Sequence, residues 1–175
     1  MEKISERKML MRFSYCPHCG SRLGSRSLGD EGLVPWCDSC EIPLFDMFSS
    51  CIIALVVNEY EEAAILRQNY LSSQYGTLVS GYMKPGESAE DCASREVMEE
   101  LGIGLEEIRI VKTWWHGRKD QLMIGFVGRA KKADFKLSSE VNEARWVPVE
   151  EALGQVHPKG SISYALIELY LHRKP

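Results

Sequence analysis

Short apolar segments separated by polar turns dominate the chain from residue 49 onward. The segment CIIALVV (51–57) is apolar without interruption, which is typical of a buried strand. Five more segments combine β-branched or aromatic residues with polar boundaries and also predict strands: AAILRQN (63–69), TLVSGYM (77–83), EIRIVKTWW (107–115), QLMIGFVGRA (121–130) and ARWVPV (144–149). The pattern therefore predicts a sheet.

Two segments have the spacing of helices instead. Four apolar residues recur at every fourth position and so face the core: Ala89, Ala93, Val97 and Leu101. Ser88 is placed to cap this helix, with Asp91 three residues on, and Gly102 is placed to end it. A terminal helix is predicted at 161–172. Strands and helices mix without strict alternation, which predicts the α/β class, with a mixed sheet flanked by helices.

Four of the six cysteines form two pairs, Cys16-Pro-His-Cys19 and Cys37-Asp-Ser-Cys40. Each pair places two thiolates on one tight turn, and two such turns close a tetrahedron around Zn²⁺. The alternative is two disulfides, which a reducing compartment disfavours. Residues 13–48 are too few to bury a useful core, so metal binding must supply folding free energy there. This stretch therefore predicts a zinc ribbon of short strands.

The length of 175 residues allows one full domain and a small one. We expect an N-terminal arm and the zinc ribbon in residues 1–48, and a larger domain in residues 49–175. The formal net charge of −4 argues against bulk attraction to nucleic acid or anionic lipid. The longest apolar run is too short to span a bilayer, and the first residues do not resemble a secretory signal. We therefore expect a cytoplasmic protein.

An acidic cluster lies on the helix that follows Ser88. Glu96, Glu99 and Glu100 stand at i, i+3 and i+4, so their carboxylates are expected to converge. Two bare carboxylates about 4 Å apart repel by roughly 4 kcal/mol at an effective dielectric near 20. Because a hard divalent cation reverses the sign of this energy, the spacing predicts a site for Mg²⁺ or Mn²⁺. The alternative is a solvated acidic face, which explains neither the nearby glycines nor Arg95.

The segment around this cluster resembles the Nudix box. Every defining position is filled, by Gly81, Glu87, Arg95, Glu96, Val97, Glu99, Glu100, Gly102 and Ile103. The resemblance implies a Nudix-type α/β/α sandwich that hydrolyses a nucleoside diphosphate linked to another group, using a divalent metal. A four-cysteine ribbon directly before such a domain resembles the NADH pyrophosphatase-like group. Members of that group split NAD(H), and some remove NAD caps from RNA.

The resemblance also implies roles for individual residues. The implied catalytic set is Glu87, Arg95, Glu96, Glu99 and Glu100. Within it, Glu87 and Arg95 form a structural pair that fixes the loop against the helix. The implied ligands of Mg²⁺ or Mn²⁺ are Glu96, Glu99, Glu100, Glu140 and the carbonyl of Ser80. The alternative for Glu140 is a glutamate on a surface loop. The general base stays open between Glu96 and Glu99, with Glu140 as a further candidate.

Three aromatic residues are candidates for substrate contact. Tyr82 stands where relatives use an aromatic residue near the base or nicotinamide. Trp114 and Trp115 offer a stacking surface for a base, or else one lies in the core and the other packs under the ribbon. Both belong to TWWHGRK (113–119), which aligns with the motif Ser-Gln-Pro-Trp-Pro-Phe-Pro that marks NAD(H) specificity in the group. That proline-rich motif is absent here. The same segment offers three candidates for a phosphate contact or a solvated turn: His116, Arg118 and Lys119.

Two functions of different classes follow. The first is a metal-dependent pyrophosphohydrolase acting on a small nucleotide substrate, NAD(H) or a related dinucleotide. The second is a non-catalytic nucleotide sensor or nucleic-acid-binding protein that uses the zinc ribbon for contact. We favour the enzyme, because the box is intact and the ribbon lacks a dense basic face. No membrane partner is expected, and nucleic acid only as capped RNA. The resemblance implies a homodimer.

Overall fold

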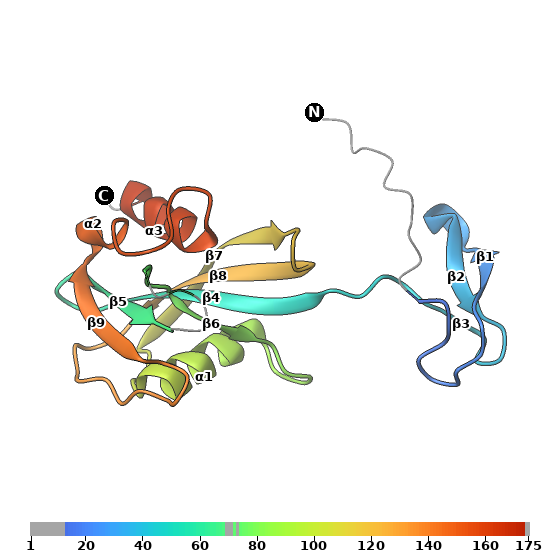
Figure 1. The fold of residues 1–175 in the computed structure, drawn as a ribbon, viewed down its shortest axis with the longest axis horizontal. Helices are drawn as coiled ribbons and strands as arrows, with labels where there is room; N and C mark the ends of the chain where they lie inside the picture. The colour runs from blue at the N-terminus through green and yellow to red at the C-terminus, as the bar shows by residue number, and fades with distance from the viewer. Residues whose placement is uncertain (1–12, 69–71, 73, 174–175) are drawn as a thin grey trace. The chain divides into compact units, whose positions relative to one another are not determined.

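The computed structural model describes residues 13–68, 72 and 74–173 (Figure 1). The chain divides into two compact units between Met47 and Phe48, one residue before the predicted boundary. The arm expected at residues 1–12 and the last residue of the strand expected at 63–69 lie outside the described residues.

The N-terminal unit is a small antiparallel sheet that carries the two cysteine pairs. Its strands pair in the order β1-β2-β3, with the bounds β1 Gly24–Ser27, β2 Leu33–Cys37 and β3 Ile42–Pro43. A 3₁₀ turn, η1 (Gly29–Glu31), joins the first two strands. The buried apolar cluster of this unit consists of Cys16, Leu23 and Cys37. So small a core cannot stabilise the unit by itself, which supports a further stabilising element.

The C-terminal unit is built on a six-stranded mixed sheet, as predicted. The strands are β4 Ser49–Val57, β5 Glu62–Arg67, β6 Val79–Tyr82, β7 Glu107–His116, β8 Gln121–Arg129 and β9 Glu143–Pro148. Their order is β7-β8-β4-β5-β9, and β6 also pairs with β4. The pairing of β4 with β8 is parallel, and the other pairings are antiparallel. Residues 51–57 of β4 are all buried, so the unbroken apolar run did mark a central strand.

Helices cover both faces of this sheet (Figure 1). They are α1 Ala89–Leu101, α2 Val149–Ala152 and α3 Ile162–Arg173. One buried cluster joins α1 to the sheet through Ile52, Val97 and Phe126, and a second joins α2 and α3 to the opposite face. This arrangement is the α/β/α sandwich that the sequence predicts. Among the described residues, no helix is long and apolar enough to cross a membrane.

Both ends of α1 are fixed by the residues that the sequence marks. The Ser88 hydroxyl accepts a hydrogen bond from the Asp91 N–H at 3.1 Å and donates one to the Asp91 carboxylate at 2.7 Å. Gly102 adopts φ 68°, and its N–H donates to the carbonyl of Met98. Because these caps are local, they could be recognised without any knowledge of the tertiary structure.

Strand β4 pairs with two different strands along the same edge. Its residues Cys51–Ala54 pair with β6, whereas Val57 pairs with β5. The division brings β6 under α1, so Ser80 and Gly81 lie next to the acidic helix. The position of Gly81 against the acidic helix depends on this pairing.

Candidate active site

Glu96 packs directly against the backbone of Gly81. A Cβ atom built on Gly81 would lie 2.0 Å from Cδ of Glu96 and 2.1 Å from its Oε1, far inside van der Waals contact. The glycine of the sequence motif therefore makes room for this carboxylate, and a larger residue would displace it.

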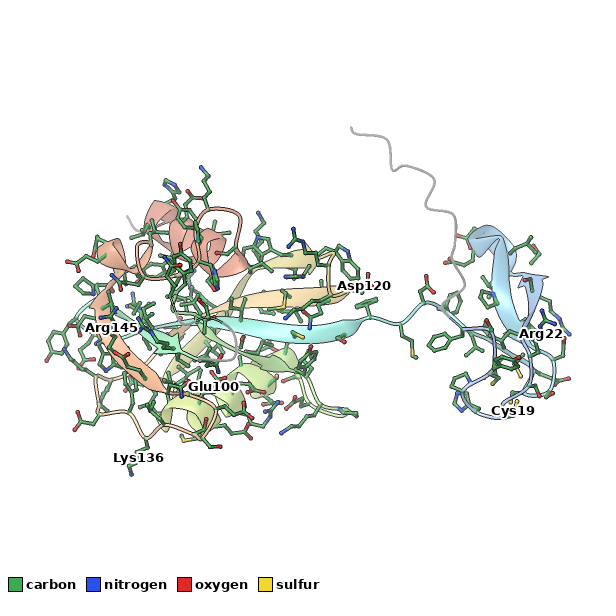
Figure 2. The ribbon with its side chains drawn as sticks, in the orientation of Figure 1. Cys19, Arg22, Glu100, Asp120, Lys136 and Arg145 are labelled. Carbon is green, nitrogen blue, oxygen red and sulfur yellow. The ribbon has the colours of Figure 1, made fainter. Side chains whose placement is uncertain are left out.

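Glu100 is the buried acid of the site, at 4% exposure. It lies on α1 (Figure 2). Its Oε1 accepts a hydrogen bond from Nε2 of Gln68 at 3.0 Å, but its Oε2 is buried with no partner in the part of the chain that the structure describes. Burial raises the pKa of Glu100 to about 7, helped by the charges of Glu96 and Glu140 and opposed by the Gln68 hydrogen bond. The ionised form therefore needs a positive charge nearby.

A cavity of about 460 Å³ opens beside these two carboxylates. It is lined by Cys51, Ser80, Gly81, Tyr82, Glu96, Glu100, Lys119, Gln121, Met123 and Glu140. Three of these side chains are carboxylates from α1 and from the loop before β9. A hard divalent cation prefers such oxygen ligands, and the unpartnered Oε2 of Glu100 is the kind of atom that it would satisfy. The residues present therefore fit Mg²⁺ or Mn²⁺.

Arg95 joins the loop before α1 to the acidic helix. Its guanidinium donates to both oxygens of Glu87, at 2.8 and 3.0 Å, and to Glu96 at 2.7 Å. It also donates to the carbonyl of Tyr82 at 3.2 Å. These hydrogen bonds lower the pKa of Glu87 to about 2 and raise the pKa of Arg95 above its usual range. The structure thus places Glu87 and Arg95 where a pair fixing the loop is expected.

Glu99 lies apart from the other two glutamates of the cluster. Its side chain is 51% exposed, accepts a hydrogen bond from Arg95 at 3.0 Å and forms an ion pair with Lys84 at 3.8 Å. It does not line the cavity, whereas Glu96 and Glu100 do. Arg95 stands between the carboxylates of Glu96 and Glu99, and their attraction to its charge offsets the repulsion expected from the spacing. Two of the three clustered carboxylates therefore meet at the cavity, and a metal contact by Glu99 stays a prediction.

Of the three aromatic candidates, Tyr82 alone lines this cavity. Its hydroxyl accepts a hydrogen bond from Nε2 of Gln121 at 2.7 Å. Trp114 is partly buried against the cluster beneath α3, while Trp115 is 47% exposed and meets the ring of Phe48 edge-on at 5.5 Å. Neighbouring residues of a strand point to opposite faces, which separates the two tryptophans. The stacking role proposed for them from sequence stays untested.

The four paired cysteines come together in the ribbon. Their sulfur atoms all lie within 4.8 Å of one another, with Cys16 and Cys40 at 4.0 Å and Cys19 and Cys37 at 3.5 Å. Sulfur atoms bound to one zinc at about 2.3 Å with tetrahedral geometry would be spaced by roughly 3.8 Å. The thiols are free rather than paired as disulfides. The cluster therefore fits a structural Zn²⁺.

Two buried glutamines support the site and were not singled out from the sequence. Gln68, 3% exposed, holds Glu100, and Gln121, 5% exposed, holds Tyr82. Both stand at the end of an apolar segment, where a polar residue is the normal signal of a turn. No local sequence pattern links either glutamine to the site, because each contact is made across the fold, over 32 residues for Gln68 and 39 for Gln121.

Comparison with known protein families gives one direct match. The family described as NUDIX domain matches residues 47–170, which is most of the chain. The NAD-capped RNA hydrolase NudC of Stutzerimonas stutzeri (strain A1501) is 31% identical over 163 residues, covering 91% of this chain and 56% of that protein. The NAD-capped RNA hydrolase NudC of Vibrio cholerae is 29% identical over 161 residues, covering 91% and 58%. The chain therefore spans under three fifths of the length of these relatives.

Solved structures share the fold. A NUDIX hydrolase from Nitrosomonas europaea superposes with a TM-score of 0.66 at 18% identity, over 93% of this chain and 95% of that chain. The NUDIX domain of Shewanella oneidensis NrtR, solved as a complex with ADP ribose, gives a TM-score of 0.63 at 13% identity, over 79% and 93%. At such identities the likeness shows the fold alone.

Proposed function

Because this chain belongs to the Nudix family, we propose that it hydrolyses the pyrophosphate bond of a nucleoside diphosphate derivative with the help of Mg²⁺ or Mn²⁺. The observation that carries the proposal is the buried carboxylate of Glu100. It has one oxygen without a partner among the described residues and shares a cavity with Glu96 and Glu140. A purely structural acid in such a place would be expected to be paired or replaced.

Glu96 and Glu100 would hold the divalent cation, with the carbonyl of Ser80 and with Glu99 as further ligands; Glu140 would either complete this set or act as the base. When bound, the cation neutralises diphosphate oxygens and lowers the pKa of a bound water. Glu96 is held in place for this task by Arg95 on one side and by the open space over Gly81 on the other. Lys119, which lines the same cavity, adds a positive charge for the anionic substrate.

The proton of the attacking water needs a carboxylate acceptor that reaches the cavity. Glu140 is exposed and lines the cavity, whereas Glu99 is exposed and does not. Glu96 is already engaged by Arg95 at 2.7 Å. We therefore propose Glu140 as the first candidate for the base, ahead of Glu99 and Glu96.

The substrate is proposed from the relatives. Both NudC proteins are named NAD-capped RNA hydrolases, so dinucleotides such as NAD(H), and RNA that carries an NAD cap, are the first compounds to test. The segment TWWHGRK departs from the proline-rich motif of the NADH pyrophosphatase-like group, so a different second half of the substrate is equally worth testing.

The remaining parts of the proposal concern the ribbon and the assembly. We propose that Zn²⁺ bound by Cys16, Cys19, Cys37 and Cys40 stabilises the ribbon, because its buried apolar cluster is small. The homodimer and the cytoplasmic location are expectations that light scattering and cell fractionation would test.

A substrate panel tests the proposed activity. NADH, NAD, NAD-capped RNA, ADP-ribose, FAD, diadenosine polyphosphates and nucleoside triphosphates are incubated with Mg²⁺ or Mn²⁺, and products are separated by chromatography. We expect cleavage of at least one diphosphate bond, its loss in Glu100→Gln, and its retention in Glu90→Gln, an exposed acid on the first turn of the same helix. Tight binding of one compound without cleavage of any would favour the sensor instead.

A further inference from the structure

A second cavity lies next to the catalytic cavity and shares part of its wall. The two share four lining residues, Ser80, Lys119, Gln121 and Met123. The second cavity has a volume of about 320 Å³, within the range of roughly 300–1,000 Å³ that is usual for small-molecule sites. A substrate cleaved at the first cavity could therefore extend into the second.

The two cavities differ in the charge of their walls. The catalytic cavity contains three glutamates. Among the described residues that line the second cavity there is no aspartate or glutamate, and the basic groups are Lys119, His116 and His157. In the described part of the chain, the ammonium of Lys119 makes no hydrogen bond or ion pair. The second cavity is therefore suited to an anion, and the first to a cation.

Two side chains that line the second cavity carry a polar atom without a hydrogen bond among the described residues. Nδ1 of His116 is buried without a hydrogen bond among the described residues. Ser163 is only 9% exposed, and its hydroxyl makes no hydrogen bond in the part of the chain that the structure describes. Ser163 belongs to the first turn of α3, which Ser161 caps by accepting a hydrogen bond from the Tyr164 N–H at 3.2 Å. The first turn of a helix favours negative charge, which adds to the effect of the basic side chains.

We propose that this second cavity binds a phosphate monoester carried by the substrate. The preferred substrates are then nucleoside diphosphate derivatives with an additional phosphate on a ribose. A phosphate monoester brings close to two negative charges and three acceptor oxygens, which match one ammonium, two imidazoles and a hydroxyl better than a neutral ring would. His116 and Lys119 belong to TWWHGRK (113–119), the segment that aligns with the proline-rich motif and does not contain it. This inference rests on the proposed function.

Matched substrate pairs test the proposal. NADPH is compared with NADH, and coenzyme A with 3′-dephospho-coenzyme A, each with Mg²⁺, because the members of a pair differ by one phosphate. We expect kcat/KM to be at least about tenfold higher for the phosphorylated member of one pair, as for a charge-assisted hydrogen-bonded contact. Lys119→Gln and Ser163→Ala should each lower that ratio several-fold. Arg118→Gln should leave it unchanged, because Arg118 lies one position from Lys119, is exposed and does not line the cavity.

The possible results separate the two proposals. A ratio near one in both pairs, with clear hydrolysis of NADH or dephospho-coenzyme A, overturns the phosphate site and leaves the proposed activity standing. A ratio that Arg118→Gln lowers as much as Lys119→Gln also overturns it, since net charge alone would then explain the preference. If none of the four compounds is hydrolysed, dissociation constants are measured by calorimetry instead. Equal constants within each pair overturn the site, and tighter binding of the phosphorylated compound supports it although the proposed hydrolysis has failed.

Discussion

Replacing Glu100 with glutamine should stabilise the metal-free protein at alkaline pH while abolishing hydrolysis. The pKa of Glu100 is raised from 4.5 to about 7 in the fold, mainly by burial. The folded protein binds this proton more tightly than the unfolded chain does. Ionising Glu100 therefore costs folding free energy, and this penalty is absent below about pH 4.5, where the carboxyl group is protonated in both states. The penalty grows as pH rises and is complete above pH 7. At 1.36 kcal/mol per unit it amounts to about 3 kcal/mol at most.

The glutamine variant removes this penalty and keeps an acceptor for Nε2 of Gln68. The amide nitrogen that replaces Oε2 has no partner among the described residues, and this cost offsets part of the gain. We therefore expect the free energy of unfolding to rise by about 1–2 kcal/mol at pH 8. Urea unfolding in metal-depleted buffer measures it, with tryptophan fluorescence as the signal. A Trp36→Phe background leaves the other three tryptophans, all in the C-terminal unit, as reporters.

The pH dependence decides whether the reasoning holds. The gain of the variant should shrink as pH falls from 8 to 5.5, because the wild-type carboxylate then takes up its proton. Added Mn²⁺ should stabilise the wild-type protein and not the variant, since a ligand stabilises only the fold that binds it. A difference that stays the same at both pH values, or a variant less stable at pH 8, would refute a buried acid with a raised pKa.

Further variants test the rest of the site and the zinc ribbon. Gly81→Ala should lower activity by more than about 100-fold with little loss of stability, because its Cβ would push aside the flexible end of the Glu96 side chain and no backbone atom. Gly104→Ala, whose Cβ would lie 3.8 Å from its nearest neighbour, serves as the control in the same assays. Glu140→Gln should reduce kcat more than Glu99→Gln does, because only the first residue lines the cavity, and equal losses would argue against that assignment. Cys37→Ser should release zinc, as measured by metal analysis, and expose β2 to proteolysis; full zinc content would contradict the four-thiolate site.

The sequence allowed those parts of the fold to be predicted that depend on local patterns. Strand β4 and helix α1 were recognisable because an unbroken apolar run and a capped helix with a four-residue apolar repeat are fixed by neighbouring residues. The four-residue helix α2 carries too few residues to show a period, and no helix was predicted there. The spacing of the motif showed that Glu96 and Gly81 belong together, but it could not show that they touch. That contact also depends on the pairing of β6 with β4.

The direction of individual side chains was harder to predict. Helical spacing puts Glu99 beside its two neighbours, yet Arg95 and Lys84 draw its carboxylate to the outside of the site. The second cavity gathers residues from β7, β8 and the start of α3, which are far apart in the chain. No local pattern could join His116 to Ser163. Such sites become visible only when the layers of the fold are in place.

Strand β4 is buried on both sides, and its alternate residues belong to different cores. Ile52, Ala54 and Val56 pack towards α1, whereas Ile53, Leu55 and Val57 pack towards α2 and α3. Ile53 also lines the second cavity. Because Cys51 lines the catalytic cavity, substitutions at these two odd-numbered positions, 51 and 53, would act on selectivity while the packing beneath the acidic helix is kept. Substitutions at the even-numbered positions 52, 54 and 56 would instead act on the packing under α1, since none of those residues lines either cavity.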